Sequence, residues 1–395
     1  MIQPVIAGAG MTTFGRFPAS TVRSLANDAA QRALLDAGVR ADQIEQVFFS
    51  NATSGLLTGQ EMIRGQVALR DLGLSAVPVV NVENACASGS TAFHLAATSI
   101  AAGEAEIILV VGSEKLSHED KARTFAALGS AVDLERLDQV KTSLYGEDVP
   151  TTSDRSFFMD VYAHMATTYM KQSGATESDF ATVAAKSHQN AALNPYAAAH
   201  RSVSAEEVSA SRHITGPLTL LMCSPISDGA AAIVMMSASK AAELGLDYVA
   251  VRASAMASGL GADDPVAVAV SKAYELAGIG PEDINVVEVH DAAAPAELIM
   301  YETLGLCLPG DGPRLLASGD TAINGRIPVN PSGGLVGKGH PVGATGVAQI
   351  VELVDQLRKR SGGHQVPMAR VGLAENGGGY LGPNPAAATI TILSV

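Results

Sequence analysis

The sequence contains no tryptophan and only three cysteines among its 395 residues. Cys86, Cys223 and Cys307 are far apart, odd in number and form no Cys-x-x-Cys pair. A disulfide framework and a structural zinc site both need paired or closely spaced cysteines, so we expect neither. This cysteine usage is typical of a reducing compartment, and we expect a cytoplasmic protein.

Basic residues are also scarce, with 26 lysines and arginines against 40 acidic residues and a net charge of −14. Sequence-independent binding to nucleic acid needs a basic face, so the charge argues against such a partner. It does not exclude a small anionic ligand, because a local cluster of arginine and lysine can lie on an acidic protein. Charged residues make up 17% and hydrophobic residues 47%, which indicates a globular chain.

Long apolar runs are absent as well, since none reaches the roughly 18–20 residues of a membrane span. The best candidate, residues 92–112, is interrupted by His94, Glu104 and Glu106. Residues 1–4 carry no basic segment, so we expect no signal peptide.

Short runs rich in valine and isoleucine alternate with amphipathic stretches. The expected strands are 4–8, 46–50, 77–82 and 107–112, and the expected helices between them include 21–37 and 91–102. Such alternation predicts βα units around a buried sheet. The strand pattern fades from about 115 to 215, where helical stretches predict an inserted layer.

The last third repeats the opening pattern. Strands are expected at 248–255, 285–289 and 388–395, and helices at 264–277, 296–305 and 346–359. We therefore predict an N-terminal half, residues 1–250 with the insertion at about 115–215, and a C-terminal half, residues 251–395.

Cys86 lies in a turn of small residues, 84–91, between a strand that ends near Val82 and a helix. A helix N-terminus favours negative charge, so we expect the pKa of the Cys86 thiol to fall below about 8.5. Small neighbours such as Gly89 leave room for an acyl thioester. The alternative is an inert buried cysteine, which is the commoner fate of a free thiol. The flanking pattern favours a nucleophile.

His340 lies in residues 337–346, which read Gly-Lys-Gly-His-Pro-Val-Gly-Ala-Thr-Gly. So many glycines indicate close backbone approach, and Pro341 fixes the backbone after the histidine. A base held on such a turn can take a proton from a thiol. The alternative is a structural turn with an incidental histidine.

His290 follows the expected strand 285–289. In an open α/β sheet, ligands bind at the carboxyl ends of the strands. An exposed loop histidine is the alternative that the residues alone leave open.

Glu375 and Asn376 precede three glycines that begin at Gly377. Unobstructed backbone N–H groups suit an oxyanion hole, and the alternative is a flexible surface turn. The remaining histidines form no HExxH pair or other ligand spacing, so we expect no metal.

These motifs, in this order, resemble those of the thiolase superfamily over essentially the whole chain. The Cys86 turn resembles the nucleophile motif, 339–346 the Gly-His-Pro motif, 224–232 the segment that re-enters the core, and His164-Met165 a His-Met pair in the loop domain. The resemblance implies an α/β fold with duplicated βαβαβαββ halves, a five-layered αβαβα core and an inserted helical loop domain.

The closer resemblance is to the sterol-carrier-protein-type branch, whose His-Asp-Cys-Phe motif corresponds to His290-Asp291-Ala292-Ala293 here. Ordinary thiolases carry a second catalytic cysteine in a Cys-x-Gly motif. Aligning Gly377 with that glycine places Glu375 at the cysteine position, and Ala292 stands where the sterol-carrier branch can carry one. The second thiol is therefore absent, and Glu375 becomes the candidate acid/base, with Asn376 or His290 assisting.

The resemblance implies an acyl-CoA C-acyltransferase that cleaves a 3-oxoacyl-CoA, or runs the reverse Claisen condensation, with coenzyme A as co-substrate and no permanent cofactor. Its implied catalytic residues are Cys86, His290, His340 and Glu375, with an oxyanion hole from the backbone of Cys86 and Gly377. Substrate contacts are expected from Ser224, His164, Met165 and Asn376, and phosphate contacts from Lys121, Arg123, Lys141 and Arg155. It further implies a homodimer or higher oligomer, and the missing thiol leaves open a small partner subunit with an OB fold and a zinc ribbon.

Three other functions stay open. Cys86, His290 and His340 form the Cys-His-His set of decarboxylating β-ketoacyl synthases. A retro-aldol lyase of the same branch is a second alternative, although aldol cleavage needs no acyl-enzyme. The third is a non-catalytic acyl-CoA or lipid-binding protein on the same scaffold.

Overall fold

Nine strands join in the order β3-β2-β4-β7-β1-β8-β11-β10-β9 within the residues that this computed structural model describes, 2–145 and 155–395. The strands are β1 (Pro4–Met11), β2 (Gln46–Ser50), β3 (Val79–Val82), β4 (Ile107–Glu114), β7 (Gly229–Ser237), β8 (Val249–Ser258), β9 (Val286–Glu288), β10 (Val371–Gly378) and β11 (Ala387–Ser394). The two halves meet where β1 pairs with β8 at Val5–Ala250 and Ile6–Val249. This short junction links the sheet of one half to the sheet of the other.

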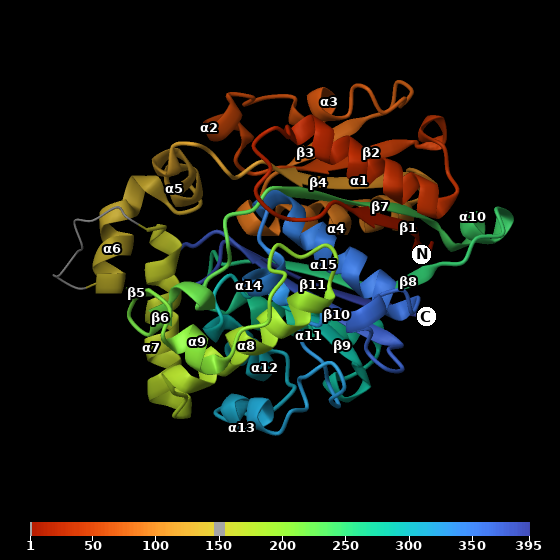
Figure 1. The fold of residues 1–395 in the computed structure, drawn as a ribbon. Helices are drawn as coiled ribbons and strands as arrows, with labels where there is room; N and C mark the ends of the chain where they lie inside the picture. The colour runs from red at the N-terminus through yellow and green to blue at the C-terminus, as the bar shows by residue number, and fades with distance from the viewer. Residues whose placement is uncertain (1, 146–154) are drawn as a thin grey trace.

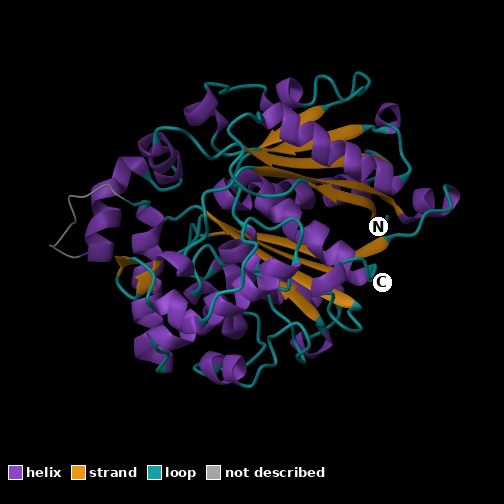
Figure 2. Cartoon of the chain, viewed as in Figure 1, coloured by secondary structure: helices purple, strands orange, loops and turns teal. Residues whose placement is uncertain are grey.

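Helices form three layers around the two sheets (Figures 1 and 2). Helix α1 (Val22–Ala37) packs on β1 and β7, and α11 (Pro265–Ala277) packs on β8 and β11. Between the sheets lie α4 (Ser88–Ala102) and α15 (Val342–Leu357), which contact each other and strands of both halves. The expected five-layered αβαβα core is thereby confirmed.

The central position of α15 follows from its sequence. Every residue of α15 except Asp355 is buried, because the helix is apolar apart from a few polar side chains that are hydrogen-bonded, Thr345, Gln349, Glu352 and Gln356. Helix α1 instead buries a face of small residues, including Ala26, Ala29 and Ala33. This face lies so close to β1 that a Cβ on Gly8 would sit 2.3 Å from the Ala33 carbonyl oxygen.

The two halves repeat one topology with one difference. The first half places β3 in parallel beside β2 at the sheet edge, whereas the second has only an isolated parallel bridge between Val287 and Val329 at the corresponding place. The remaining helices of the two halves are α2 (Ser54–Thr58), α3 (Arg64–Ala68), α10 (Ala238–Glu243), α12 (Pro295–Thr303), α13 (Gly312–Ala317) and α14 (Gly334–Lys338).

The glycine-rich segment that contains Glu375 is not a surface turn. It forms the end of β10, which pairs along its whole length with β11, including Gly377 with Ala388. Glycine and polar residues disfavour strands by composition, but pairing of residues 375–378 with β11 overrides this preference. The alternative of a flexible turn is therefore wrong.

The inserted segment lies between β4 and β7 and extends beyond the expected boundary at residue 215. Its elements are α5 (Lys121–Gly129), α6 (Leu137–Tyr145), α7 (Phe157–Ser173), α8 (Glu177–Leu193), α9 (Ala205–Ser209), β5 (His213–Thr215) and β6 (Leu218–Thr219). Helix α8 packs against α14, and α7 against α12, so the insertion covers the end of the second half (Figure 1). In the part of the chain that the structure describes, no helix is long and apolar enough to cross a membrane.

Candidate active site

Two helix N-termini meet at the centre of the molecule. Cys86 lies in the 3₁₀ helix η2 (Ala85–Ala87), directly before α4, and His340 comes two residues before α15. The helices cross at glycines, because a Cβ on Gly346 would lie 2.3 Å from the backbone nitrogen of Ser90. This close approach places the cysteine and the histidine, 254 residues apart in sequence, side by side.

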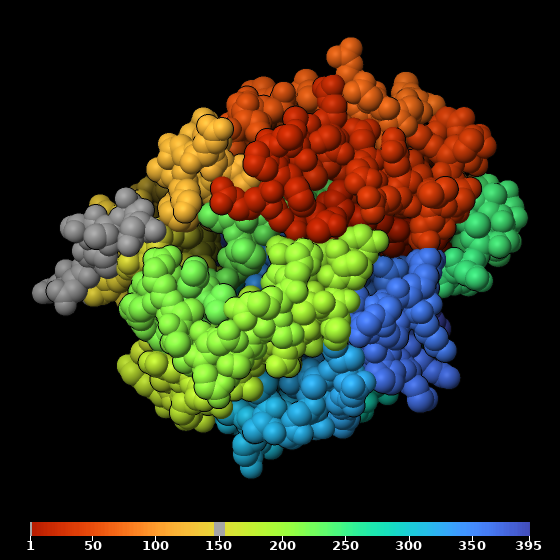
Figure 3. Space-filling model, in the orientation of Figure 1, coloured from red at the N-terminus to blue at the C-terminus, as the bar shows by residue number. Residues whose placement is uncertain are grey.

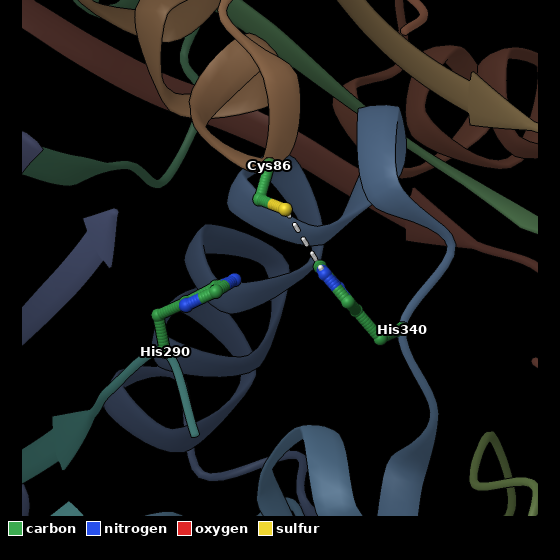
Figure 4. Close-up of side chains that lie close together, drawn as sticks. All are labelled: Cys86, His290 and His340. Atoms are coloured by element: carbon green, nitrogen blue, oxygen red, sulfur yellow. Dashed lines mark hydrogen bonds between the residues drawn. The ribbon is translucent and has the colours of Figure 1, made fainter. Parts of the chain in front are cut away.

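The Cys86 thiol contacts His340 directly. Cys86 Sγ lies 3.3 Å from His340 Nε2, as the dashed line in Figure 4 marks. The Thr345 hydroxyl donates to the Pro341 carbonyl at 3.1 Å, so its oxygen accepts from His340 Nδ1 at 2.7 Å. Because Nδ1 then carries the ring proton, Nε2 is the free base that accepts the proton of the thiol.

His290 completes a group of three side chains. Its ring lies 5.0 Å from that of His340, centroid to centroid, at an interplanar angle of 77°. Figure 4 shows both rings directed toward Cys86 from different elements. His290 follows β9, and its backbone N–H donates to Glu375 Oε2 at 2.9 Å. The structure thus brings together all four residues expected to be catalytic.

The ionisation of Cys86 differs from the expectation. Burial raises the pKa of the Cys86 thiol to about 12, and the nearby Glu114 adds to the rise, whereas backbone hydrogen bonds from Gly379 and Cys86 itself oppose it. The expected lowering of this pKa is wrong for the free protein, because the cost of burying a charge outweighs the field of the helix N-terminus.

Both histidines are neutral at physiological pH. Burial lowers the pKa of His290 to about 4, and burial together with the neighbouring His290 lowers the pKa of His340 well below its usual range. The resting pair is therefore a neutral thiol and a neutral imidazole. A thiolate forms only as its proton moves to His340.

Glu375 faces the cavity from β10, and its neighbour does not. Side chains alternate along a strand, so Asn376 points to the opposite face, where its Oδ1 accepts from Ser90 Oγ at 2.8 Å. Glu375 is 3% exposed. Burial raises the pKa of its carboxyl to about 7, against the lowering effect of the His290 N–H. A carboxyl that titrates near neutrality can both donate and accept a proton.

A cavity of about 1090 Å³ opens above these four residues. The recess between the red-to-orange N-terminal segments and the green part of the insertion is visible in Figure 3. One part of its lining is apolar and comes largely from the insertion, including Phe125, Leu128, Phe158, Met159 and Met165. Its lining lysines and arginines are Arg16, Arg64, Lys121, Arg155 and Arg212.

The other expected contact residues divide between the cavity and elsewhere. Ser224 and Met165 line the cavity, and the Ser224 N–H donates to the carbonyl of Ala292 at 3.0 Å. His164 is exposed and does not line it, because adjacent helix positions face different directions. Of the basic residues expected at the phosphates, Lys121 and Arg155 line the cavity, whereas Arg123 and Lys141 do not.

Three residues that contact the site were not predicted from the sequence. Tyr162 lies 3.4 Å from His290, Thr345 orients His340, and Gly379 hydrogen-bonds the Cys86 thiol. The last two stand within the glycine-rich motifs, where they could have been singled out. No sequence pattern marks Tyr162, which comes from the insertion.

The site also has the composition of a metal site. One donor atom from each of Cys86, His290 and His340 lies within 4.8 Å of the others, so these three residues could hold a soft divalent ion. Binding an ion there would occupy the proposed nucleophile, so it competes with acylation rather than supporting it.

Comparisons with known proteins identify the family. The chain matches the family model "Thiolase, N-terminal domain" over residues 4–239 and the model "Thiolase C-terminal domain-like" over residues 250–394. Benzoylsuccinyl-CoA thiolase subunit BbsB of Thauera aromatica is 36% identical over 387 residues, covering 95% of this chain and 94% of that protein. An acetyl-CoA acetyltransferase of Methanothermobacter thermautotrophicus is 37% identical over 388 residues, covering 96% and 97%. Human sterol carrier protein 2 is 34% identical over 94% of this chain and 69% of its own length.

Solved structures agree at the level of the fold. The structure of "Ltp2-ChsH2(DUF35) aldolase" matches with a TM-score of 0.80 at 24% identity, over 100% of this chain and 98% of that one. An acetyl-CoA acetyltransferase from Syntrophomonas wolfei matches with a TM-score of 0.71 at 21% identity, over 100% and 99%. The chain therefore belongs to the thiolase family, which confirms the expected fold and the expected class of enzyme, a thiolase-type acyltransferase.

Proposed function

We propose that the chain is an acyl-CoA C-acyltransferase that cleaves a 3-oxoacyl-CoA with free coenzyme A, or runs the reverse Claisen condensation, through an acyl-Cys86 intermediate. The observation that carries the proposal is the 3.3 Å contact between Cys86 Sγ and the unprotonated Nε2 of His340, in a cavity that also contains His290 and Glu375. A nucleophile beside an oriented base is the arrangement that covalent catalysis requires.

The first step forms the acyl-enzyme. The proton of the Cys86 thiol moves to His340 Nε2 as the sulfur attacks the keto carbon. The oxyanion that develops accepts a hydrogen bond from the N–H of His290 and from protonated His340. When it collapses, the bond between the α-carbon and the keto carbon breaks, and the acyl group stays on Cys86. Preorganised donors of this kind contribute about 10²–10³ in rate each.

Glu375 supplies the acid/base function of the missing second cysteine. Its protonated carboxyl donates to the α-carbon of the departing enolate, whose thioester oxygen is held by backbone N–H groups near Cys86. We expected Gly377 as one of these donors, and the hydrogen bond from Gly379 to the thiol favours Gly379 as another. The Glu375 carboxylate then takes the proton of coenzyme A as that thiol attacks the acyl-enzyme. Protonated His340 returns its proton to Cys86, so the cycle closes.

The cavity supports coenzyme A as the co-substrate. Five lysine and arginine side chains line it, and two of them, Lys121 and Arg155, were expected to contact the phosphates. Arg16 and Arg212 are exposed and also line the cavity, although neither was among the residues predicted to contact the phosphates. The apolar lining from the insertion suits an acyl chain. One relative is named a benzoylsuccinyl-CoA thiolase subunit, so aromatic acyl groups are included in the test.

A decarboxylating synthase is the second candidate, because the donor atoms of Cys86, His290 and His340 lie within 4.8 Å of one another. A synthase would release CO₂ from a malonyl thioester, which a thiolase does not. Glu375 has no role in that reaction, whereas the thiolase proposal requires it.

A partner subunit is part of the proposal. One relative is named as a subunit of its thiolase, and the aldolase structure pairs its chain with a DUF35 protein by name. We infer that this chain works with a small partner of that kind, so the activity test is run with and without a co-expressed partner.

Intact-protein mass spectrometry tests the function. The protein is mixed with a panel of 3-oxoacyl-CoA esters without free coenzyme A, next to Cys86→Ala and Cys223→Ala. Cys223 also lines the cavity, so its variant controls for acylation of the wrong thiol. We expect an adduct in the wild type and in Cys223→Ala that coenzyme A releases, and none in Cys86→Ala. Tight ester binding with no adduct, with or without the partner, would overturn the proposal in favour of a binding protein. Cleavage without an adduct would indicate a lyase.

A further inference from the structure

The inserted helix α7 sends one polar side chain to the active site. Tyr162 lines the cavity, and its hydroxyl lies 3.4 Å from His290 Nδ1. The two residues are 128 positions apart, on the insertion and on the second half. The contact therefore depends on how the insertion packs.

The hydrogen on this bond can be assigned. The Tyr162 hydroxyl has no other hydrogen-bond acceptor among the residues that the structure describes, so its proton is satisfied by His290 Nδ1. Burial, and to a smaller extent the nearby Cys86 and Glu375, raise the pKa of the Tyr162 phenol well above its usual value, so the group keeps its proton. A neutral imidazole nitrogen can also donate, but a donating Nδ1 would leave the phenol proton without an acceptor among the described residues, so the phenol is assigned as the donor.

The other ring nitrogen is then determined. A neutral imidazole carries one proton, so acceptance at Nδ1 leaves the proton on Nε2. His290 Nε2 is buried and, within the described residues, has no hydrogen-bond partner. A buried donor without a partner is costly to maintain, which is expected where a ligand will accept from it.

We propose that Tyr162 is a positioning residue, whose hydroxyl holds His290 in the tautomer that presents Nε2–H to the substrate oxygen beside Cys86. The identity of the substrate oxygen rests on the proposed function. The tautomer of His290 rests on the geometry alone. The two imidazoles at the site thereby take opposite roles. Thr345 makes His340 Nε2 an acceptor, and Tyr162 makes His290 Nε2 a donor.

The direct test reads the tautomer in the free protein. Histidine labelled with ¹⁵N distinguishes an Nε2–H from an Nδ1–H imidazole by the shifts of its two nitrogens, and the signal of His290 is assigned by its loss in His290→Ala. We expect Nε2–H in the wild type and a mixture or Nδ1–H in Tyr162→Phe. A wild-type Nδ1–H, or an unchanged tautomer in Tyr162→Phe, would overturn the proposal. Because no substrate is present, this readout stands even where the proposed function fails.

The kinetic test uses two tyrosines on the same helix. Tyr162→Phe is expected to slow acylation of Cys86 by on the order of 10- to 100-fold, the usual cost of losing a group that orients a functional histidine, with little change in ester affinity. Tyr169→Phe is the matched control, since the Tyr169 hydroxyl bonds Glu302 outside the cavity. We expect the control to stay within twofold of the wild type. An equal loss in both variants would mean that Tyr162 only stabilises α7.

A double-mutant cycle separates positioning from direct catalysis. If Tyr162 acts through His290, then Tyr162→Phe has no further effect in a His290→Ala background. A full 10- to 100-fold loss in that background would show that the phenol acts on the substrate independently, and would overturn the positioning role.

Discussion

The backbone N–H of His290 donates a hydrogen bond to the side chain of Glu375, with 2.9 Å between the nitrogen and Oε2. His290 comes just after β9, and Glu375 lies in β10. The two strands are parallel neighbours, and Glu288 of β9 pairs with Ala374 of β10. The proposed oxyanion donor and the proposed acid/base are thus fixed to one edge of one sheet. Elements of secondary structure hold a site more rigidly than loops do.

Replacing Glu375 by glutamine is expected to separate the two halves of the reaction. Glutamine keeps an oxygen for the His290 N–H but has no proton to transfer, so cleavage of the carbon–carbon bond falls by about 10²–10⁴-fold, the range for a general acid. Transfer of an acyl group from a thioester to Cys86 uses Glu375 only to protonate the departing thiolate, so an ester of an acidic thiol such as thiophenol needs no such proton and should acylate Cys86 near the wild-type rate. Steady-state thiolysis and the mass of the acyl-enzyme measure the two steps.

Glu375→Cys is the companion variant, because it restores the residue type that ordinary thiolases have at this position. We expect it to recover part of the lost cleavage activity. In Glu375→Gln, a loss of acyl transfer from the thiophenyl ester equal to the loss of cleavage would show that the residue supports the fold of the site and not the proton transfer.

The pH dependence is expected to report Glu375. Burial raises the pKa of its carboxyl to about 7, so the group is protonated below that pH and ionised above it. Thiolysis uses the protonated form at the enolate and therefore falls as pH rises through 7, whereas condensation uses the carboxylate and rises. The two histidines and Cys86 do not change charge near pH 7.

Rates of single-turnover cleavage and condensation between pH 5.5 and 8.5 check this prediction. The change in each rate around pH 7 is expected to disappear in Glu375→Gln. If the rates of the variant still change around pH 7, another group titrates there and the assignment to Glu375 is contradicted.

Thr345→Val removes the acceptor that fixes the tautomer of His340. Valine has a similar volume, so packing in α15 is retained while the 2.7 Å contact to Nδ1 is lost. Acylation of Cys86 is expected to slow by about 10²-fold, within the range of a general base. Rapid-quench measurement of the acyl-enzyme checks the rate, and the unfolding midpoint serves as the control. A large fall in the midpoint with a normal acylation rate would mean that Thr345 is structural.

The chemistry of the site was predictable from sequence where the motif is local. Cys86 and His340 each stand in a turn of small residues directly before a helix, which marked both as candidates. Glycines allow the two helices to cross closely, so their N-termini and these two residues lie near one another. The strand containing Glu375 was not predicted, because its composition is that of a turn and its pairing comes from β11.

Two properties depend on tertiary structure and could not be read from the sequence. The pKa of Cys86 depends on complete burial, which a local motif does not report. Tyr162 reaches His290 only because the insertion folds back over the second half. Likewise, His164 and Asn376 lie beside cavity-lining residues in sequence but face elsewhere, since register on a helix or strand decides which neighbour faces inward.

The crossing of α4 and α15 predicts a strict need for glycine. An alanine Cβ at Gly346 would lie 2.3 Å from the backbone nitrogen of Ser90, and backbone cannot move as a flexible side chain can. Gly346→Ala is therefore expected to lower the free energy of unfolding by at least the upper end of the roughly 1–3 kcal/mol that overpacking costs. It should also move His340 from Cys86, and a shift of about 1 Å costs on the order of 10²-fold in rate.

Gly363→Ala is the matched control, since its Cβ would meet nothing nearer than 3.5 Å. It should change the free energy of unfolding by no more than about 0.5 kcal/mol, as surface substitutions usually do. Urea denaturation gives both values, and acylation by mass gives the rate. If Gly346→Ala matched the control in both measurements, the helices would have to separate easily, and close crossing could not be what brings Cys86 to His340.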